Sequence, residues 1–296
     1  MRAFIRKLKP DLIFEDISPL PWFSPVLARR MPRVVIFHHL NGRSFFQTQS
    51  FVKAWVGFLL EGSVFLLYKK ENMIVINDYL AEILRSRGFR KVFKIVDGVD
   101  VKKYRPNPKI RSKYPVVLFL GRLERRKGAD LLIKTYPIVK KSVPNVEYWI
   151  VGDGAERRKL ESMAERIGEH GSGIRFFGFK DGIEKIRLIQ KSWIVTVPSR
   201  AEGYGLSVLE ANACGVPALA NNVPGLSESV INGRTGVLTD CLNAEKFADA
   251  LIIVLKDKKR LADMGRRARR FADKHLWESC ARGTLLVLKK ALEGKR

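Results

Sequence analysis

The segment Ser199–Pro217, SRAEGYGLSVLEANACGVP, decides the fold of this 296-residue chain. The apolar run from Trp193 to Val197 precedes it and predicts a buried strand. The glycines at the start of the segment predict a loop that opens a helix, and Gly215 and Pro217 predict where that helix ends. A strand, a loop and a helix in this order are typical of the ligand-binding edge of a parallel sheet.

Two glutamates and an anion site are expected in this segment. Glu202 lies in the predicted loop, and Glu210 lies about two turns away on the helix. Between them, the backbone N–H groups of Gly205, Leu206 and Ser207 have no intrahelical partner, and the helix dipole favours an anion there. A phosphate between two hydroxyl-binding carboxylates suits a nucleotide-sugar. The alternative is a solvated loop glutamate and an ordinary helix-surface charge, which a lone pair at this spacing would favour.

Apolar runs alternate with helical patterns along the rest of the chain. This alternation predicts an α/β fold with doubly wound parallel sheets. Before the Pro-rich basic segment 105–115, which we interpret as an interdomain linker, the pattern predicts strands at 11–15, 33–37, 73–76 and 92–96, and helices at 45–68 and 79–87. After it, strands are expected at 116–120, 146–151, 174–177, 193–197, 217–220 and 236–238.

Composition excludes several classes of protein. Cys214, Cys241 and Cys280 are widely spaced without a C-x-x-C pair, which argues against a disulfide scaffold or a zinc site and fits a reducing cytosol. The N-terminus lacks the apolar region of a signal peptide. The apolar stretch Phe51–Tyr68 is interrupted by charges and falls short of a membrane span; we expect a core helix, with an interfacial helix as the alternative.

The net charge of +25, from 55 basic and 30 acidic residues, bears on partners rather than on the fold. Residues 256–296 hold fourteen Lys and Arg against five Asp and Glu. No nucleic-acid-binding motif is present, so no nucleic-acid partner is expected. Peripheral attachment to an anionic membrane, or a lipid-linked substrate, fits better, with a generally solvated basic surface as the equal alternative.

The loop after the strand at 116–120 supplies two cations, Arg122 and Lys127. A guanidinium and an ammonium are a natural pair for a diphosphate, and fixed cations stabilise the charge that develops on it as it leaves. We expect both to point towards the helix N-terminus near Gly205. The alternative is a basic surface turn.

Glycine pairs and histidines supply the remaining candidates. Gly152 and Gly154 follow a strand, but the third glycine of a dinucleotide-binding fingerprint is missing, so NAD is excluded. We expect these glycines to let the backbone approach a base or ribose, with a tight turn as the alternative. His38, at the end of the strand 33–37, is a candidate hydrogen-bond donor to a sugar or phosphate, against a structural histidine at even odds. His39 is an equal candidate, whereas His170 and His275 lack supporting context.

The motifs together resemble glycosyltransferase family 4, whose fold is GT-B, with two Rossmann-like domains facing a crevice. The resemblance rests on GR at 121–122 with KG at 127–128, GDG at 152–154, FG at 177–178, PS at 198–199, the spacing E-x7-E from Glu202 to Glu210, GVP at 215–217, and GLSE at 225–228 with GRTG at 233–236. It extends back to DGVD at 97–100, where the family has NGVD.

The resemblance implies a retaining, hexosyltransferase-like enzyme that takes a sugar from a nucleotide-diphosphate donor and passes it to a glycan or lipid-linked acceptor. It implies no cofactor and no metal. The residues that it assigns to catalysis are Arg122, Lys127, Glu202 and His38. Those that it assigns to donor binding are Gly121, Gly152, Gly154, Gly203, Tyr204, Gly205, Leu206, Ser207 and Glu210.

The same resemblance sets the expected domain organisation. We expect a partial N-terminal domain at 1–105, a nucleotide-sugar-binding domain at 106–275, and an amphipathic helix at 276–296 that packs back on the first domain. Residues 1–60 hold no glycine-rich loop, although the family begins with one, so the first domain is expected to be incomplete. A non-catalytic nucleotide-sugar-binding remnant is therefore the alternative function. The expected location is the cytoplasm, with attachment to the inner face of the membrane as an option.

Overall fold

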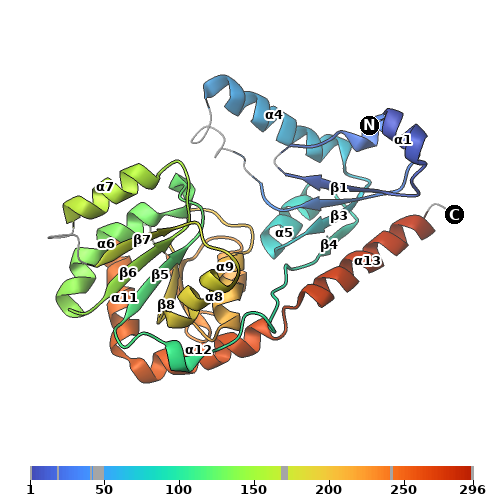
Figure 1. Cartoon of the computed structure of the whole chain (residues 1–296). Helices are drawn as coiled ribbons and strands as arrows, with labels where there is room; N and C mark the ends of the chain where they lie inside the picture. Colours follow the sequence, from blue (N-terminus) through green and yellow to red (C-terminus); the bar gives the residue numbers. More distant parts are fainter. Residues whose placement is uncertain are drawn as a thin grey trace. The chain divides into compact units, whose positions relative to one another are not determined.

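The computed structural model describes residues 2–18, 20–40, 42, 50–167, 173–240 and 243–294. The chain divides into two compact units (Figure 1): Met1–Asp97 with Glu278–Arg296, and Gly98–Trp277. The domain boundaries inferred from sequence follow residues 105 and 275 instead.

The first unit is built on a parallel sheet of four strands in the order β1-β2-β3-β4. Its central strands β2 and β3 are almost entirely buried and mostly apolar, as expected for strands covered on both faces of a sheet. The elements are α1 (Arg2–Leu8), β1 (Ile13–Ile17), α2 (Ser24–Leu27), β2 (Arg33–Phe37), α4 (Phe51–Leu67), β3 (Asn72–Val75), α5 (Asp78–Ser86), β4 (Val92–Lys94) and α13 (Trp277–Glu293).

Helices cover both faces of this first sheet. On one face, Val35, Phe37 and Met73 pack with residues of α4 and α5. On the other face, Val34 and Ile74 pack with Val287 and Ala291 of α13. Helix α13 therefore completes the core of the first unit. Its buried stripe is centred on Val287 and Ala291, whereas Leu292 is exposed.

The second unit contains a parallel sheet of six strands in the order β7-β6-β5-β8-β9-β10. The chain runs outward from β5 to β7 and then returns to the other side of β5 with β8, so the strand order reverses between β5 and β8. In open parallel sheets this reversal point is where ligands bind. The elements are η2 (Pro108–Ile110), β5 (Val116–Leu120), η3 (Arg125–Lys127), α6 (Ala129–Ser142), β6 (Glu147–Val151), α7 (Arg157–Ile167), β7 (Ile174–Gly178), α8 (Gly182–Lys191), β8 (Ile194–Val197), α9 (Leu206–Ala213), β9 (Ala218–Asn221), α10 (Leu226–Ser229), β10 (Gly236–Thr239), α11 (Ala244–Lys256) and α12 (Lys258–Ala272).

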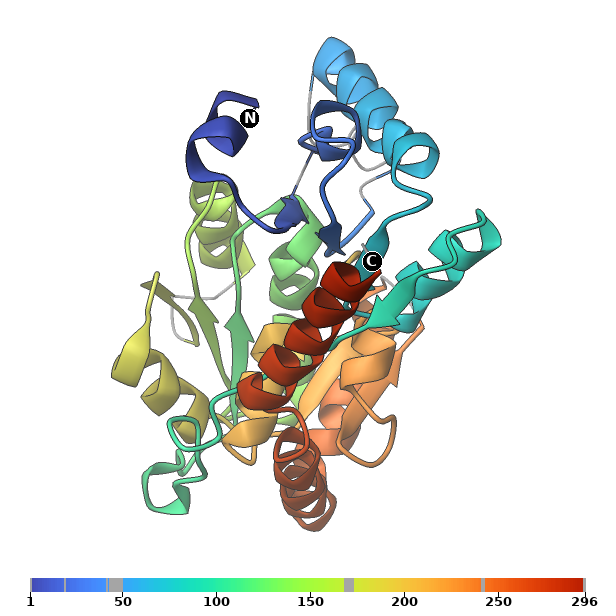
Figure 2. The same cartoon turned by 90° about the vertical axis from the view of Figure 1, so that its right-hand side faces the viewer.

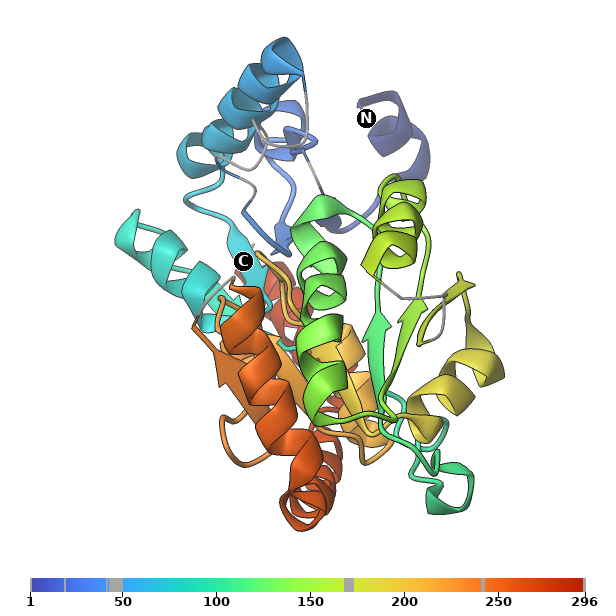
Figure 3. The same cartoon turned by 90° about the vertical axis from the view of Figure 1, so that its left-hand side faces the viewer.

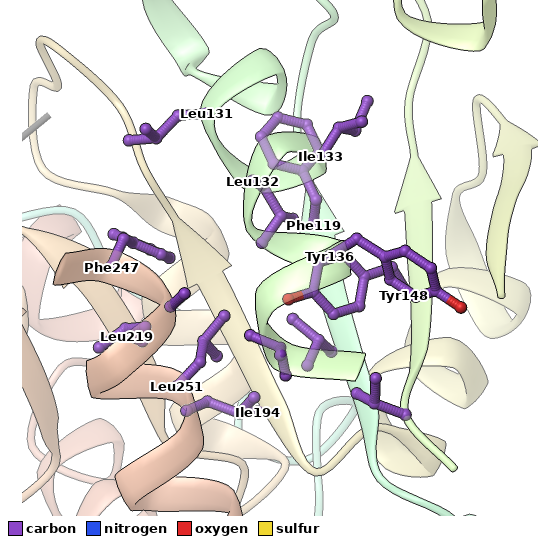
Figure 4. Close-up of a cluster of buried hydrophobic side chains, with 14 of the residues drawn as sticks. Phe119, Leu131, Leu132, Ile133, Tyr136, Tyr148, Ile194, Leu219, Phe247 and Leu251 are labelled. Carbon is purple, nitrogen blue, oxygen red and sulfur yellow. The ribbon is translucent and has the colours of Figure 1, made fainter. Parts of the chain in front are cut away.

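The main core of the second unit lies between one face of this sheet and helices α6 and α11, which run side by side (Figure 3). Figure 4 shows Phe119, Ile194 and Leu219 of the strands facing Tyr136 of α6 and Leu251 of α11. Helices α8 and α9 contact β5 and β8. The sheet is therefore a rigid platform that fixes where the loops after β5 and β8 emerge.

The segment interpreted from sequence as a linker is anchored to the second unit. Gln190 Nε2 donates to the Arg105 carbonyl at 2.7 Å, and Trp193 Nε1 donates to the Ser112 carbonyl at 2.9 Å. Arg269 donates to the carbonyls of Val101, Tyr104 and Ala213 at 2.6 to 3.3 Å, which ties the start of the unit to α9. These bonds fix the position of residues 101–112 on the second unit.

Helix α4 departs from the expected core helix. It begins at Phe51; of the residues 45–50 that the pattern also placed in this helix, Ser50 precedes it and 45–49 lie outside the described residues. Only Ala54, Gly57, Glu61 and Val64 are buried on it, so it lies at the surface of the first unit.

Candidate functional site

The site centres on the loops that leave β5 and β8 at the reversal point of the second sheet. Lys127, from the β5 loop, places its Nζ 2.6 Å from Glu202 Oε1, in the β8 loop. Ser199 Oγ donates to the same carboxylate oxygen at 2.8 Å. Both members of the ion pair are largely buried, with 17% and 10% of their side-chain surface exposed. Two of the four predicted catalytic residues are thus in direct contact.

Backbone and side-chain bonds hold the two loops together. The Arg200 N–H donates to the Arg126 carbonyl at 2.8 Å, and the Arg200 guanidinium binds both carboxylate oxygens of Asp130 at 3.1 and 3.2 Å. Burial raises the pKa of Asp130, but the bonds from Arg200 outweigh burial and leave the pKa below its ordinary value. A Cβ on Gly128 would lie 2.0 Å from the Pro198 carbonyl oxygen, so the loops approach at a distance that only glycine allows.

Helix α9 begins where the sequence placed an anion site. Gly205 is its N-cap in the left-handed conformation, and the helix runs from Leu206 to Ala213. Among the described residues, none accepts a hydrogen bond from the amides of Gly205, Leu206 or Ser207. These donors follow Glu202 by three to five residues, so a phosphate there would lie near the Lys127–Glu202 pair.

Glu210, on α9, is held by two residues that sequence reasoning missed. Lys185 Nζ on α8 lies 2.6 Å from Glu210 Oε1, and Tyr104 OH donates to the same oxygen at 2.9 Å. Burial tends to lower the pKa of Lys185, but its bonds to Glu210 and Tyr104 outweigh burial and raise the pKa, so the ammonium stays charged. Burial, with Glu210 nearby, raises the pKa of Tyr104 to about 12. No motif signals these partners, because they come from separate segments that only packing brings together.

Arg122 does not join Lys127. Its NH1 lies 2.7 Å from Glu124 Oε1, and 67% of its side chain is exposed. Glu124 also accepts from Arg126 Nε at 2.9 Å. Arg122 therefore lies at the surface of the β5 loop, paired with a neighbour two residues along the chain.

The predicted donor-binding glycines of the β5 and β6 loops serve contacts within the protein. A Cβ on Gly152 would lie 1.9 Å from the Gly121 carbonyl oxygen, and one on Gly154 would lie 2.5 Å from the Leu123 carbonyl oxygen. The Gly121 N–H donates to Val151 O and the Gly152 N–H to Gly178 O, at 3.0 and 2.8 Å. Close packing of the two loops thus explains both glycines, whereas approach of the backbone to a base or ribose remains a prediction.

Gly203 and Tyr204, in the β8 loop, both pack against other parts of the second unit. A Cβ on Gly225 would lie 2.3 Å from the Gly203 carbonyl oxygen, so the β9 loop packs directly against the β8 loop. The Tyr204 side chain is buried at 4% exposure, with its ring 6.3 Å from that of His275. The Tyr204 side chain is therefore part of the core of the second unit.

His38 belongs to the first unit. It follows β2, and its Nε2 lies 3.5 Å from Asp16 Oδ1. Asp97 of the same unit is mostly buried; burial raises its pKa, and the charge of His38 partly counters this. His38 is about two-thirds buried, so it keeps access to solvent. His170 lies outside the described residues.

A separate basic cavity of about 920 Å³ lies beside α8 in the second unit. Five cationic side chains line it without a carboxylate: Lys102, Lys103, Arg105, Lys109 and Arg187. None of the predicted donor residues lines this cavity. The candidate donor site is therefore formed by the loops that follow β5 and β8, and this basic cavity is not part of it.

In the described part of the chain, no group of three or more His, Cys, Asp or Glu residues is arranged to hold a metal ion. None of the helices in that part is both long and apolar enough to cross a membrane.

The sequence is similar to those of known glycosyltransferases. Among curated relatives, the GDP-mannose-dependent alpha-(1-6)-phosphatidylinositol monomannoside mannosyltransferase of Mycolicibacterium smegmatis is 34% identical over 220 residues, 67% of this chain and 55% of that protein. The chain spans about half the length of the curated relatives that it matches, between 48% and 55% for three of them.

Solved structures show the GT-B fold. Sucrose-phosphate synthase from Thermosynechococcus elongatus matches with a TM-score of 0.84 and 23% identity, over 99% of this chain and 76% of that chain. Anabaena HepE in complex with UDP and glucose matches with a TM-score of 0.78 and 21% identity, over 97% of this chain and 80% of that chain. The family model described as glycosyl transferases group 1 matches residues 100–271, which include every predicted site residue except His38. The chain belongs to the glycosyl transferases group 1 family.

Proposed function

We propose that this protein transfers a hexosyl group from a nucleotide-diphosphate sugar to a glycan or lipid-linked acceptor, with retention of anomeric configuration, as a member of glycosyltransferase family 4. The observation that carries the proposal is the Lys127–Glu202 pair, at 2.6 Å, next to the helix N-terminus at Gly205. A cation, a hydroxyl-binding carboxylate and free backbone donors are the groups that a sugar diphosphate requires.

Lys127 would act on the leaving group. When the bond between the anomeric carbon and the diphosphate oxygen breaks, the electron pair stays on that oxygen, and the acceptor hydroxyl oxygen bonds to the carbon while its proton passes to the departing diphosphate. An ammonium has three donors, so Lys127 can keep Glu202 and still bind a phosphate oxygen. The α9 amides would share the developing charge, and Arg122 would add to them by exchanging its bond to Glu124 for one to a phosphate oxygen. These donors make a metal ion unnecessary in this proposal.

The two glutamates would bind hydroxyl groups at the two ends of the donor. Glu202 faces the sugar side, held by Lys127 and Ser199. Glu210 would accept hydrogen bonds from the ribose hydroxyls, with Lys185 and Tyr104 fixing its orientation through one of its oxygens. His38 would contact the sugar or phosphate from the first unit.

A thermal-shift panel of nucleotide-diphosphate sugars tests the proposal directly. UDP- and GDP-linked sugars come first, because HepE was solved with UDP and the mycobacterial relative is GDP-mannose-dependent. A donor at 100 times its Kd stabilises the folded state by about 2.7 kcal/mol, which raises the melting temperature measurably. No shift with any donor would contradict the proposal.

Turnover separates an enzyme from a binding-only protein. Release of nucleoside diphosphate with an acceptor present, and the anomeric configuration of the product by NMR, test transfer and retention. Donor binding without any release would favour the non-catalytic alternative. Cytoplasmic location and peripheral attachment to the membrane complete the proposal. The widely spaced cysteines support the first, and the basic charge supports the second.

A further inference from the structure

Helix α4 turns its most apolar side to solvent. Six of its side chains are 44% to 77% exposed: Phe51, Val52, Trp55, Val56, Leu59 and Leu66, which we call the α4 face. Successive residues of a helix are about 100° apart, so these six lie on one side of the helix, within an arc of about 140°. Gly62 and Ser63 lie between Leu59 and Leu66 on that side. The buried side carries Ala54, Gly57, Glu61 and Val64 instead. The side chains on the solvent side are therefore larger and more apolar than those on the side that packs on the sheet.

Packing within the first unit does not account for this arrangement. A helix at the surface of a soluble domain normally presents charged and polar residues to water. On α4 the aromatic rings are ordered along the outer side: Phe51 and Trp55 lie edge to face at 6.3 Å, and Trp55 and Phe58 at 6.1 Å. A contiguous apolar patch of this kind marks an interaction surface.

The exposed charges of the α4 segment itself are positive. Residues 50–70 contain three lysines, Lys53, Lys69 and Lys70, all exposed. Their one carboxylate, Glu61, is buried and accepts from the Gly42 N–H at 2.6 Å. The α4 face is thus bordered by cations with no exposed carboxylate in its own segment.

A second basic edge lies next to α4. Glu15 accepts from Tyr68 OH at the end of α4 and from the Trp22 N–H before α2, at 2.6 and 2.8 Å, which places α2 beside α4 (Figure 2). Trp22 is 66% exposed, and the exposed Arg29 and Arg30 follow α2. Tryptophan and leucine bordered by lysine and arginine are characteristic of helices that lie in a membrane interface.

We propose that the α4 face inserts into the headgroup region of an anionic lipid bilayer, with α4 lying in the plane of the membrane. The lysines would then contact lipid phosphates while the leucines and aromatic rings leave water. A second copy of the chain on this face would bring the lysines of both copies together, and their repulsion disfavours that occupant. This inference rests on the proposed function in one respect, the lipid-linked acceptor. The α4 face would be the surface that brings the enzyme to the membrane where that acceptor lies.

Co-flotation of the full chain with vesicles tests this surface without any sugar donor. Wild type is expected to float with vesicles of phosphatidylcholine and phosphatidylglycerol, weakly with phosphatidylcholine alone, and less as salt increases. Leu59→Glu with Leu66→Glu should lower the bound fraction by at least about tenfold, because it removes apolar contact and adds negative charge. Ile253→Glu, on the 59% exposed surface of α11, is the matched control and should float like wild type.

The outcomes are separable. Equal flotation of the double variant and wild type, or no flotation of wild type, overturns the proposal. Light scattering that shows a wild-type dimer, dissociated by the double variant while flotation is unchanged, assigns the face to a second copy instead. The nucleotide thermal shift on the same proteins keeps the proposed function separate: a retained shift with lost flotation supports the α4 face, and wild-type flotation without any shift contradicts the donor site alone. Should the glutamate variant unfold, Leu59→Ser with Leu66→Ser provides the same comparison.

Discussion

The ammonium group of Lys127 lies 2.6 Å from a carboxylate oxygen of Glu202, a residue 75 positions further along the chain. The contact joins the loops of β5 and β8 at the point where the strand order reverses. It pairs a cation suited to phosphate with a carboxylate suited to sugar hydroxyls. The contact therefore joins the phosphate-binding and sugar-binding parts of the proposed donor site.

Lys127→Ala should weaken binding of the nucleoside diphosphate selected by the thermal-shift panel. Loss of a charge-assisted hydrogen bond costs about 1.5–3 kcal/mol, so calorimetry should show a Kd about ten- to a hundredfold higher. The rate of transfer should fall by a further factor on the order of 10²–10³ relative to wild type, because the leaving group loses its cation. Lys159→Ala, which removes an exposed lysine of α7, should change neither quantity. A Lys127→Ala protein with wild-type affinity would remove Lys127 from the site.

Glu210 should recognise ribose hydroxyls. Wild type is expected to bind the selected nucleotide about ten- to a hundredfold more tightly than its 2′-deoxy analogue, since a carboxylate left without its hydroxyl partner is costly. Glu210→Ala should bind both equally. Lys185→Met should reduce the discrimination without abolishing it, because Tyr104 still holds the carboxylate. Full discrimination in Glu210→Ala would place the ribose elsewhere.

Gly152→Ala should destabilise the second unit. The new Cβ would lie 1.9 Å from the Gly121 carbonyl oxygen, and Gly152 has a φ of 140°, which alanine rarely adopts. We expect a loss of at least about 2 kcal/mol in the free energy of unfolding, measured by urea denaturation. Gly62→Ala is the control: its Cβ meets nothing within 4 Å on helix α4, so stability should rise by about 0.5–1 kcal/mol. A neutral Gly152→Ala would show that the loops separate easily.

Asp97→Asn should stabilise the first unit at neutral pH. Burial raises the pKa of Asp97 above that of an unfolded aspartate, so the folded state holds the proton more tightly. Stability therefore falls as pH rises from the ordinary aspartate pKa through the raised value, and the loss is complete above it. Asparagine does not ionise, so it avoids the free-energy cost of a buried carboxylate. Thermal melting should show a gain for the variant at pH 7 that shrinks as pH falls towards the ordinary range. An identical gain at every pH would assign the effect to something other than titration.

The sequence determined the elements of the fold to a large extent. Continuous apolar runs predicted β2 and β5 to the residue, at 33–37 and 116–120, because a strand buried on both faces needs no polar positions. Gly215 and Pro217 predicted the end of α9, which the structure places at Ala213. The cause lies in the local sequence, because the chain adopts the left-handed conformation at Gly215. Motif spacing also indicated a glycosyltransferase, and it named Lys127 and Glu202, which the structure brings into contact.

Tertiary structure decided what those residues contact. Lys185 and Tyr104 reach Glu210 from 25 and 106 positions away, and no local pattern encodes such a meeting. Arg122 was expected to point with Lys127 towards the helix N-terminus, but it pairs with Glu124, two residues along the chain. Helix α4 was expected to be a core helix because most of its residues are apolar, and only packing shows which side the sheet covers. Sequence fixes which side chains are available at each strand end, whereas the packing of helices and loops on the finished sheets decides which of them meet and which remain in solvent.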